Sequence, residues 1–355
     1  MASQFLPRAA FPTLDSLPRS YFLGHHKSGL SKMKSMLSGI DLIVECRDYR
    51  VPLSSYNPLI EETLAGRERM VIYTKADLGK SQDRRGRMVL QANPTTSIRT
   101  LTDMRIIRDW LAPTPVQFTD KDSKSVKEVL KFAKDYAYQN GSPIGTRMMV
   151  VGMPNVGKST LLNNLRWAGV RKAKAAQTGA QPGITRKIAS SVKIAEGDDE
   201  RGGLYLVDTP GVFIPYVPDP EAMLKLALCG CVKDTIIQPQ LLADYLLYHI
   251  NLNDPALYAQ YSEPTNDINS LLEAVAKRTG RLKPGGIPDT EATALWMIQR
   301  WRNGQMGHFI LDKVAGAGLQ DHKDALKVQG PSMNQAIKAD KERRREQSRR
   351  TSWDT

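Results

Sequence analysis

The segment Gly152-Met-Pro-Asn-Val-Gly-Lys-Ser159 places a lysine and a hydroxyl directly after a loop that has glycine at both ends. It matches G-x-x-x-x-G-K-S/T, the pattern of a loop whose backbone amides surround phosphate oxygens. In that pattern Lys158 contacts the β and γ phosphates, and Ser159 supplies a hydroxyl to Mg²⁺. An apolar run at residues 148–151 precedes the loop, as expected of a buried strand. We therefore predict that a nucleoside phosphate binds at Asn155, Val156, Gly157, Lys158, Ser159 and Thr160.

A second pattern, D-x-x-G, occurs as Asp208-Thr-Pro-Gly211 after an apolar run at residues 204–207. At this distance behind a phosphate loop, Asp208 is expected near Mg²⁺ and the Gly211 amide near a γ phosphate. Between the two patterns, Thr185 is the candidate switch threonine that completes Mg²⁺ coordination. We therefore predict that Ser159, Thr185 and Asp208 hold Mg²⁺, and that Lys158 and Thr185 are catalytic.

A guanine site needs a carboxylate that accepts hydrogen bonds from the base N1–H and 2-amino groups. That carboxylate normally comes from N/T-K-x-D at the end of a strand, but no such motif follows a strand after residue 211. The convincing copy lies upstream, where a strand-like run at residues 69–73 leads into Thr74-Lys75-Ala76-Asp77. The next expected strand, residues 115–119, ends at Thr119, where a second base-contacting loop would lie. A capping box at Ser125 and Glu128 then predicts a helix.

The motifs therefore run in the order base, base, phosphate loop, switch and D-x-x-G, which is a circular permutation of the usual GTPase order. Such a permutation can preserve a sheet because domain termini often lie close together. The sequence predicts an α/β fold in which a P-loop GTPase domain with circularly permuted motif order is followed by an all-helical C-terminal domain. The expected divisions are an N-terminal targeting segment, the GTPase domain, a helical domain and a basic tail, at residues 1–24, 25–215, 216–331 and 332–355.

The same motif order, together with residues 21–25, 41–48, 50–52 and 57–58, resembles the circularly permuted GTPases that assemble the large ribosomal subunit. The likeness is strongest to the mitochondrial members and their bacterial YlqF-type relatives, and it covers about residues 20–300. It implies a GTPase that uses GTP and Mg²⁺, binds a large-subunit precursor and its rRNA, and hydrolyses GTP when the ribosome stimulates it. It also implies that the helical domain, residues 216–331, binds RNA or the ribosome. The implied function is in mitochondrial translation, and the implied location is the mitochondrial matrix.

Several positions depart from that family pattern. Thr74 replaces the usual asparagine, and Thr119 is not followed by the usual loop. Val212 stands where many GTPases have a glutamine that orients water, so intrinsic hydrolysis should be slow. Relatives with this replacement resemble potassium-activated GTPases, in which the residue corresponding to Asn155 helps to bind the ion. The histidine of the family's G-H motif corresponds to His25, for which the alternatives are a role in hydrolysis and a surface or RNA-facing position.

The charge balance indicates a polyanionic partner. The 355 residues contain 50 basic and 37 acidic residues, a formal net charge of +13. Residues 136–195 contain no Asp or Glu, whereas the tail contains a basic cluster that is either an RNA-contacting arm or a solvated end. Basic surfaces would also allow a peripheral contact with the matrix side of the inner membrane. The sequence has no apolar run long enough for a transmembrane helix, and we expect a monomer.

The remaining sequence supports these divisions and leaves two other functions open. Apolar periodicity predicts helices within residues 223–228, 241–248, 268–278 and 294–302, with Trp296 and Trp301 in the core. Residues 1–20 contain Arg8, Arg19 and one acid, which favours a mitochondrial targeting segment. The alternative functions are a nucleotide-gated RNA-binding scaffold with little turnover and an ATPase or small-molecule kinase.

Overall fold

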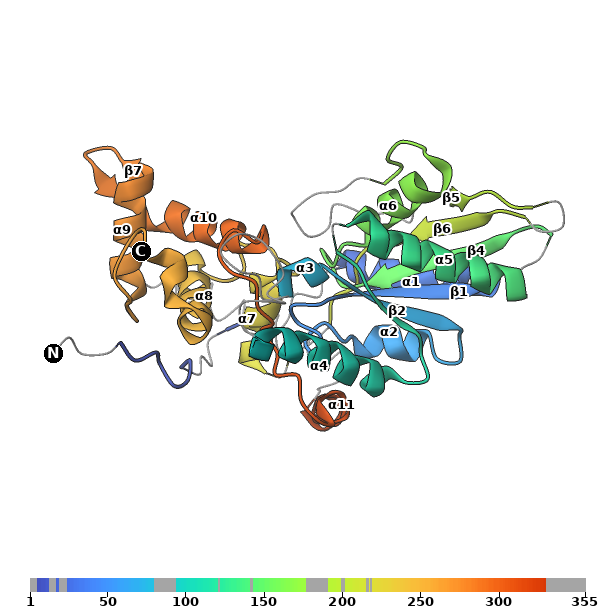
Figure 1. Ribbon diagram of the computed structural model, residues 1–355, viewed down its shortest axis with the longest axis horizontal. Helices are drawn as coiled ribbons and strands as arrows, with labels where there is room; N and C mark the ends of the chain where they lie inside the picture. Colours follow the sequence, from blue (N-terminus) through green and yellow to red (C-terminus); the bar gives the residue numbers. More distant parts are fainter. Residues whose placement is uncertain are drawn as a thin grey trace.

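The computed structural model describes most of the chain. The described residues are 5–12, 17–18, 24–79, 94–120, 122–140, 143–176, 191–198, 202–214, 217 and 219–329. The predicted switch residue Thr185 and the predicted basic tail at residues 332–355 lie outside these ranges. Figure 1 shows an α/β part built on a central sheet and a group of helices at one end of that sheet.

The central sheet orders motifs that are far apart in the chain. Its strands are β1 (Leu42–Asp48), β2 (Arg69–Thr74), β3 (Val116–Phe118), β4 (Thr146–Gly152), β5 (Val192–Ala195) and β6 (Leu204–Asp208). Within the described residues their order is β3-β2-β1-β4-β6-β5, and β5 pairs antiparallel with β6 while the other pairs are parallel. In parallel strands the carboxyl ends share one edge, which is where ligands bind in α/β sheets. The segments after β2, β4 and β6 therefore meet at one edge.

Helices cover both faces of the sheet because successive strand residues point to opposite sides. Met149 and Val151 pack in one apolar cluster with α1 (Gly24–Met36) and α2 (Pro58–Thr63), whereas Val150 belongs to the cluster on the other face. That other face is covered by α5 (Ser123–Asn140) and α6 (Lys158–Val170). The remaining helices of this part are η1 (Leu37–Gly39), α3 (Ala76–Gly79) and α4 (Pro94–Leu111).

The capping box predicted at Ser125 is wrong. Helix α5 begins at Ser123, and the Lys124 amide donates to the Asp122 carboxylate at 3.3 Å. The Ser125 hydroxyl instead donates to Asp120 Oδ1 at 2.7 Å. The Asp122 carboxylate therefore lies at the start of α5, and Ser125 lies in the first turn of the helix.

The second part of the molecule is mainly helical, as predicted. Its elements are α7 (Pro220–Leu228), α8 (Pro239–Asn253), η2 (Pro255–Tyr258), α9 (Ile268–Thr279), a short hairpin of β7 (Leu282–Lys283) and β8 (Ile287–Pro288), and α10 (Thr290–Arg302). Asp219, Asp267 and Asp289 cap α7, α9 and α10 with their carboxylates, which satisfies amides that have no partner within the helix. Trp301 is fully buried, which confirms its assignment to the core. Trp296 is partly buried, with the Arg281 and Arg300 guanidinium carbons 4.3 and 4.9 Å from its ring centroid.

The chain returns to the α/β part after α10. Helix α11 (Gly318–Gln329) packs near α4, with Leu319 in the same apolar cluster as Tyr73. Upstream of it, Asp312 Oδ2 accepts hydrogen bonds from the Leu53 and Ser54 amides, each at 2.8 Å. Residues within the expected helical domain therefore also pack against the GTPase part. No helix in the described residues is long and apolar enough to cross a lipid bilayer.

The expected targeting segment makes specific contacts with helix α8. Arg8 donates to both carboxylate oxygens of Asp244, at 3.1 and 2.6 Å. The ring of Phe11 packs edge-on against Tyr245, with the centroids 5.1 Å apart. Leu17 is also buried, within the main apolar cluster. This segment therefore contributes to the packing of the helical part, a function that its composition did not indicate.

Candidate nucleotide-binding site

The phosphate loop, residues 152–159, joins the end of β4 to the start of α6. Gly152 has φ +142°, and a Cβ there would lie 2.3 Å from the Cys46 carbonyl oxygen. Gly157 has φ +94° and occupies the N-cap position of α6. Both positions therefore require glycine, because other residues rarely adopt these conformations. The N-terminus of α6, which carries a partial positive charge, therefore points into the phosphate loop.

Lys158 is almost completely buried beside this loop. Its exposed fraction is 6%, and its Nζ donates to the Met153 carbonyl oxygen at 2.7 Å. Burial lowers the pKa of the Lys158 ammonium, and the carboxylate of Asp208 opposes part of that effect. The ammonium is thus held at the loop backbone, where a phosphate would provide a further partner.

Ser159 and Asp208 form the pair that fits Mg²⁺. The Ser159 hydroxyl donates to Asp208 Oδ2 at 2.5 Å. Asp208 is 1% exposed, and within the described residues its Oδ1 is buried without a hydrogen-bond partner. Burial raises the pKa of the Asp208 carboxyl, so a nearby cation would favour its ionised form. A hydroxyl and a carboxylate are hard oxygen ligands that Mg²⁺ accepts together with phosphate and water.

The D-x-x-G segment lies against the phosphate loop and the N-terminal part of the chain. A Cβ on Gly211 would lie 2.5 Å from the Pro154 Cα, so the two backbones are in close approach. The Val212 amide donates to the Gly152 carbonyl oxygen at 3.1 Å, and the Val212 side chain is fully buried. The Asn57 amide group donates to the Val212 carbonyl oxygen at 2.8 Å. Sequence reasoning assigned no role to Asn57.

Two adjacent histidines lie in the first turn of helix α1, and the second one contacts the D-x-x-G segment. The Nδ1 atom of His26 lies 2.8 Å from the Gly211 carbonyl oxygen, and His26 is 1% exposed. His25 is the second residue of α1, but its side chain lies outside the described part of the chain. Sequence reasoning named His25, and the described contact with Gly211 belongs to its neighbour.

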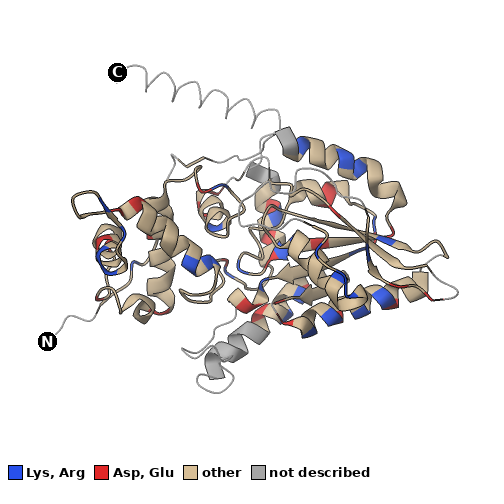
Figure 2. Cartoon of the chain, turned by 90° about the horizontal axis from the view of Figure 1, so that it is seen from above, with Lys and Arg blue, Asp and Glu red and all other residues tan. Residues whose placement is uncertain are grey.

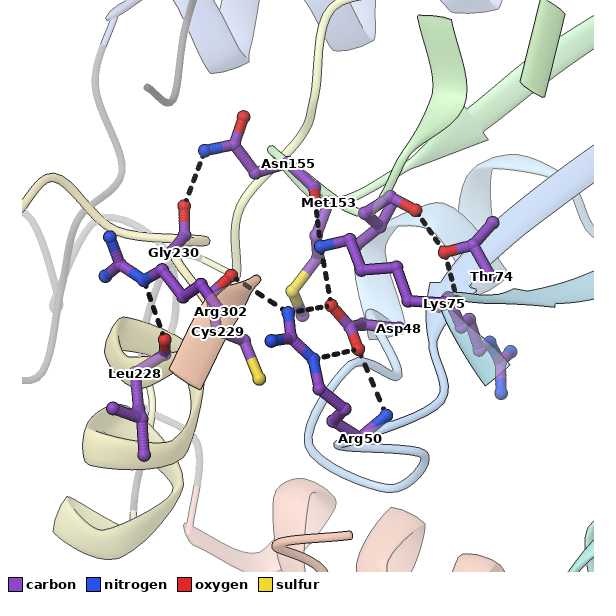
Figure 3. A network of polar contacts seen from close by, with 12 residues as sticks. Asp48, Arg50, Thr74, Lys75, Met153, Asn155, Leu228, Cys229, Gly230 and Arg302 are labelled. Carbon is purple, nitrogen blue, oxygen red and sulfur yellow. Dashed lines mark hydrogen bonds and ion pairs between the residues drawn. The ribbon is translucent and has the colours of Figure 1, made fainter. Parts of the chain in front are cut away.

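The permuted guanine motif lies beside the phosphate loop. Lys75 Nζ donates to the Asn155 carbonyl oxygen at 2.7 Å, and Thr74 Oγ1 hydrogen-bonds with the Val156 carbonyl oxygen. Asp77 lies in the first turn of α3 and is partly exposed. The Ala76 amide donates to the Thr119 carbonyl oxygen at 2.9 Å, so the ends of β2 and β3 meet. Residues 74–77 and 119 are therefore brought together with the loop from residue 155 onward. Figure 3 shows Thr74 and Lys75 beside Asn155.

Asp48, at the end of β1, anchors the guanine motif. Its buried Oδ2 accepts from Lys75 Nζ at 2.8 Å and from Arg50 Nη2 at 2.8 Å. Although burial raises the pKa of the Asp48 carboxyl, Arg50 and Lys75 hold it well below its usual range. The ionised carboxylate can therefore fix the Lys75 side chain across the loop. Asp48 and Arg50 are both visible in the sequence, but no local pattern indicated that Asp48 contacts Lys75.

The fold and the site together define a class of protein. The phosphate loop follows β4, D-x-x-G follows the neighbouring β6, and the guanine motif follows β2, on the other side of β1. All three strands end at one sheet edge, although the guanine motif comes first in the chain. This arrangement is a P-loop GTPase domain with circularly permuted motif order, and the chain is a GTPase.

Comparisons with known proteins identify the family. A family model described as 50S ribosome-binding GTPase matches residues 147–279. The chain is 36% identical to Mitochondrial GTPase 1 of Schizosaccharomyces japonicus, over 83% of this chain and 90% of that protein. It is 34% identical to Mitochondrial ribosome-associated GTPase 1 of Bos taurus, over 86% of this chain and 92% of that protein. The chain belongs to this family of mitochondrial GTPases.

A solved structure of a bacterial protein is also similar. The GNP-bound YlqF from T. maritima matches with a TM-score of 0.49 and 20% sequence identity. The match covers 80% of this chain and 97% of that one.

Proposed function

We propose that this GTPase is an assembly factor for the mitochondrial large ribosomal subunit and thereby supports mitochondrial translation. In its GTP form it binds a large-subunit precursor, and hydrolysis to GDP and phosphate releases it. The names of the relatives, which include mitochondrial ribosome-associated GTPases, support this proposal. So does the family description, 50S ribosome-binding GTPase.

One observation carries the nucleotide part of the proposal, namely the hydrogen bond from Lys75 Nζ to the Asn155 carbonyl oxygen at 2.7 Å. It joins the guanine motif to the phosphate loop, so that one GTP molecule can contact both. In this proposal Asp77 reads the guanine base and Lys158 binds the phosphates. Ser159, Asp208 and Thr185 hold Mg²⁺, which would neutralise charge on the phosphates during hydrolysis.

The basic surface supports docking on rRNA. The outward face of α5 exposes lysines at positions 124, 127, 131 and 134, and Figure 2 shows basic residues on helices of both parts of the molecule. Lysines in such positions neutralise phosphates and release counterions, so binding to RNA should weaken steeply with added salt. We place the protein in the mitochondrial matrix, as a monomer, with the same basic surface allowing a peripheral contact with the inner membrane.

The test is a pelleting experiment with mitochondrial large-subunit precursors, in GDP and in a non-hydrolysable GTP analogue. The protein should sediment with the precursors in the analogue and remain mostly in solution in GDP. Raising the salt from about 50 to 200 mM should release most of the bound protein. Equal sedimentation in both nucleotides would contradict a GTP-dependent assembly factor, and a flat salt response would indicate a protein partner instead of RNA.

The buried Val212 favours a second candidate function, a nucleotide-gated RNA-binding scaffold with little turnover. Its side chain is 0% exposed and packs in an apolar cluster with α1, so it cannot orient an attacking water. In the GTPase proposal the ribosome stimulates hydrolysis and so compensates for the missing water-orienting side chain at Val212. K⁺ bound near Asn155 is a further activator. Steady-state hydrolysis separates the two functions: precursors and K⁺ should raise the rate by at least tenfold. No increase would favour the scaffold.

A further inference from the structure

Helix α7 ends next to the phosphate loop, and its end has a well-defined backbone cap. Gly230 has φ +81°, and its amide donates to the Ala227 carbonyl oxygen at 2.9 Å. The following amide, of Cys231, donates to the Leu226 carbonyl oxygen at 2.9 Å. This pair of bonds is the usual termination of a helix by a left-handed glycine. The next carbonyl oxygens of this end, those of Leu228, Cys229 and Gly230, accept hydrogen bonds from side chains of other elements.

One of these side chains, Arg302, comes from helix α10 of the helical part. Its Nε donates to the Leu228 carbonyl oxygen at 2.9 Å, and its Nη2 donates to the Ala227 carbonyl oxygen at 2.8 Å. The guanidinium is held in place by both carboxylate oxygens of Asp234, at 2.6 and 3.0 Å. A cation at the C-terminus of a helix also interacts favourably with the helix dipole. Arg302 therefore ties the end of α7 to α10.

The other two side chains come from the nucleotide site. Asn155, within the phosphate loop, donates from Nδ2 to the Gly230 carbonyl oxygen at 2.8 Å. Arg50 donates from Nη2 to the Cys229 carbonyl oxygen at 3.4 Å. Arg50 in turn pairs with Asp48, the residue that holds Lys75 of the guanine motif. Figure 3 shows how these contacts converge on the end of α7 from both sides.

We propose that the C-terminal end of α7 couples the nucleotide site to the helical part, with Arg302 as the positioning residue on the helical side. This inference rests on the proposed nucleotide site. In this proposal a bound phosphate acts on the loop that contains Asn155, whose side chain donates directly to the Gly230 carbonyl oxygen. Because α7 is a rigid element, a shift of its end moves the helices that Arg302 ties to it. Two nucleotides that favour different loop arrangements thus favour different positions of the helical part.

Coupling of this kind is reciprocal, which provides the test. If bound nucleotides change the position of the end of α7, then removing Arg302, which ties that end to α10, must change the relative affinities for two nucleotides. We would measure the dissociation constants of fluorescent GDP and of a fluorescent non-hydrolysable GTP analogue for the full chain. The Arg302→Ala variant should change the ratio of the two constants by at least about fivefold. Asp234→Ala, which only loosens the guanidinium, should change the ratio in the same direction by about twofold.

Asp244→Ala is the matched control. Asp244 also pairs with an arginine, Arg8, and lies in helix α8 of the helical part, whereas the side chains bonded to the end of α7 are Arg302, Arg50 and Asn155. Its ratio should equal the wild-type value within the error of the measurement, and thermal unfolding would show that all variants are folded. An unchanged ratio in folded Arg302→Ala, or an equal change in Asp244→Ala, overturns the coupling. Failure of the wild-type chain to bind either nucleotide would instead overturn the proposed nucleotide site itself.

Discussion

Lys75 Nζ lies 2.7 Å from the carbonyl oxygen of Asn155, although 80 positions separate the two residues in the chain. The same ammonium lies 2.8 Å from Asp48 Oδ2. One lysine thus joins three strand ends of the sheet, those of β1, β2 and β4. The geometry of the guanine motif relative to the phosphate loop depends on this contact.

Replacing Lys75 by methionine should weaken nucleotide binding and lower stability. Asp48 would lose one of its two cations while remaining buried, which costs several kcal/mol in a fully buried pair. Because the Lys75 side chain is 26% exposed, we expect a smaller loss of about 1–3 kcal/mol in the free energy of unfolding. GDP affinity should fall at least tenfold.

A double-mutant cycle checks this assignment. Urea unfolding of Lys75→Met, Asp48→Asn and the double variant should give a coupling energy of about 1 kcal/mol or more. Simple addition of the two single effects would mean that the contact between Lys75 and Asp48 has no energetic role.

Changing Asp77 to asparagine should move the base preference from guanine toward xanthine. In the proposed site the Asp77 carboxylate accepts hydrogen bonds from the 2-amino group of guanine, whereas an amide there could donate one to the 2-carbonyl oxygen of xanthine. Competition between GDP and XDP for the purified variant measures the preference. Asp109→Asn, an exposed acid on α4, is the control and should leave the preference for guanine unchanged. If Asp77→Asn also prefers guanine as strongly as the wild type, the permuted motif is misassigned.

Lys158→Ala should abolish GTP binding under ordinary assay conditions. The ammonium is nearly buried beside the phosphate loop, and its loss would remove the charged partner of the β and γ phosphates. We expect affinity to drop at least about 100-fold, the equivalent of about 2.8 kcal/mol. Lys134→Ala on the exposed face of α5 is the control, with wild-type nucleotide affinity. Retained affinity in a folded Lys158→Ala protein would refute the site assignment.

The N-terminal segment should remain in the mature protein because it is part of the packing of α8. Deleting residues 1–12 removes the Arg8–Asp244 ion pair and the contact between Phe11 and Tyr245. We expect a loss of about 2 kcal/mol in the free energy of unfolding, mostly from the phenylalanine. A deletion of residues 1–4 serves as the control. Mass spectrometry of the mitochondrial protein should find Arg8 present, and a mature N-terminus beyond Phe11 would contradict this expectation.

His249 should make the helical part less stable in mild acid. It is buried against Tyr245 and Phe309, and burial, with a further contribution from Lys225, lowers the pKa of its imidazole to about 4 despite Glu221 and Asp312. Below pH 6.5 the unfolded chain takes up a proton that the folded chain does not. Stability should therefore fall as the pH drops from about 6.5 to 4, by up to about 1.4 kcal/mol for each pH unit.

His249→Phe isolates this effect because it keeps the aromatic packing and removes the titrating group. Thermal unfolding of both proteins at several pH values between 7.5 and 4.5 makes the comparison. The wild-type melting temperature should decrease more than that of the variant over this interval. Parallel curves would show that other groups are responsible for the acid sensitivity.

The nucleotide motifs were predictable because their chemistry is local. The phosphate loop needs a lysine, a hydroxyl and two glycines within eight consecutive residues, and the structure places both glycines at positive φ. The existence of helices α7 to α10 follows from apolar periodicity for the same reason, although α7, α8 and α10 begin two to four residues earlier than that pattern indicated. The error at Ser125 is also local, since Asp122 accepts the Lys124 amide at the helix start while the Ser125 hydroxyl donates to Asp120.

Contacts between distant segments could not be predicted in this way. Which of His25 and His26 reaches Gly211 depends on the rotation of α1 about its axis. That rotation is set by the packing of Leu30 and Met33 against the sheet. The contact of Arg8 with Asp244 likewise joins residues 236 positions apart, and no local pattern marks it.

The order of the motifs was enough to establish a permuted GTPase, because each motif carries its own chemistry and its place in the chain can be read directly. The alignment of parallel strands decided that Asp48, Lys75 and Asn155 meet. The packing of the end of α7 against the phosphate loop and α10 decided which side chains converge on it. Those outcomes depend on the burial of apolar residues spread over the whole chain, and so they appear only when the complete fold is known.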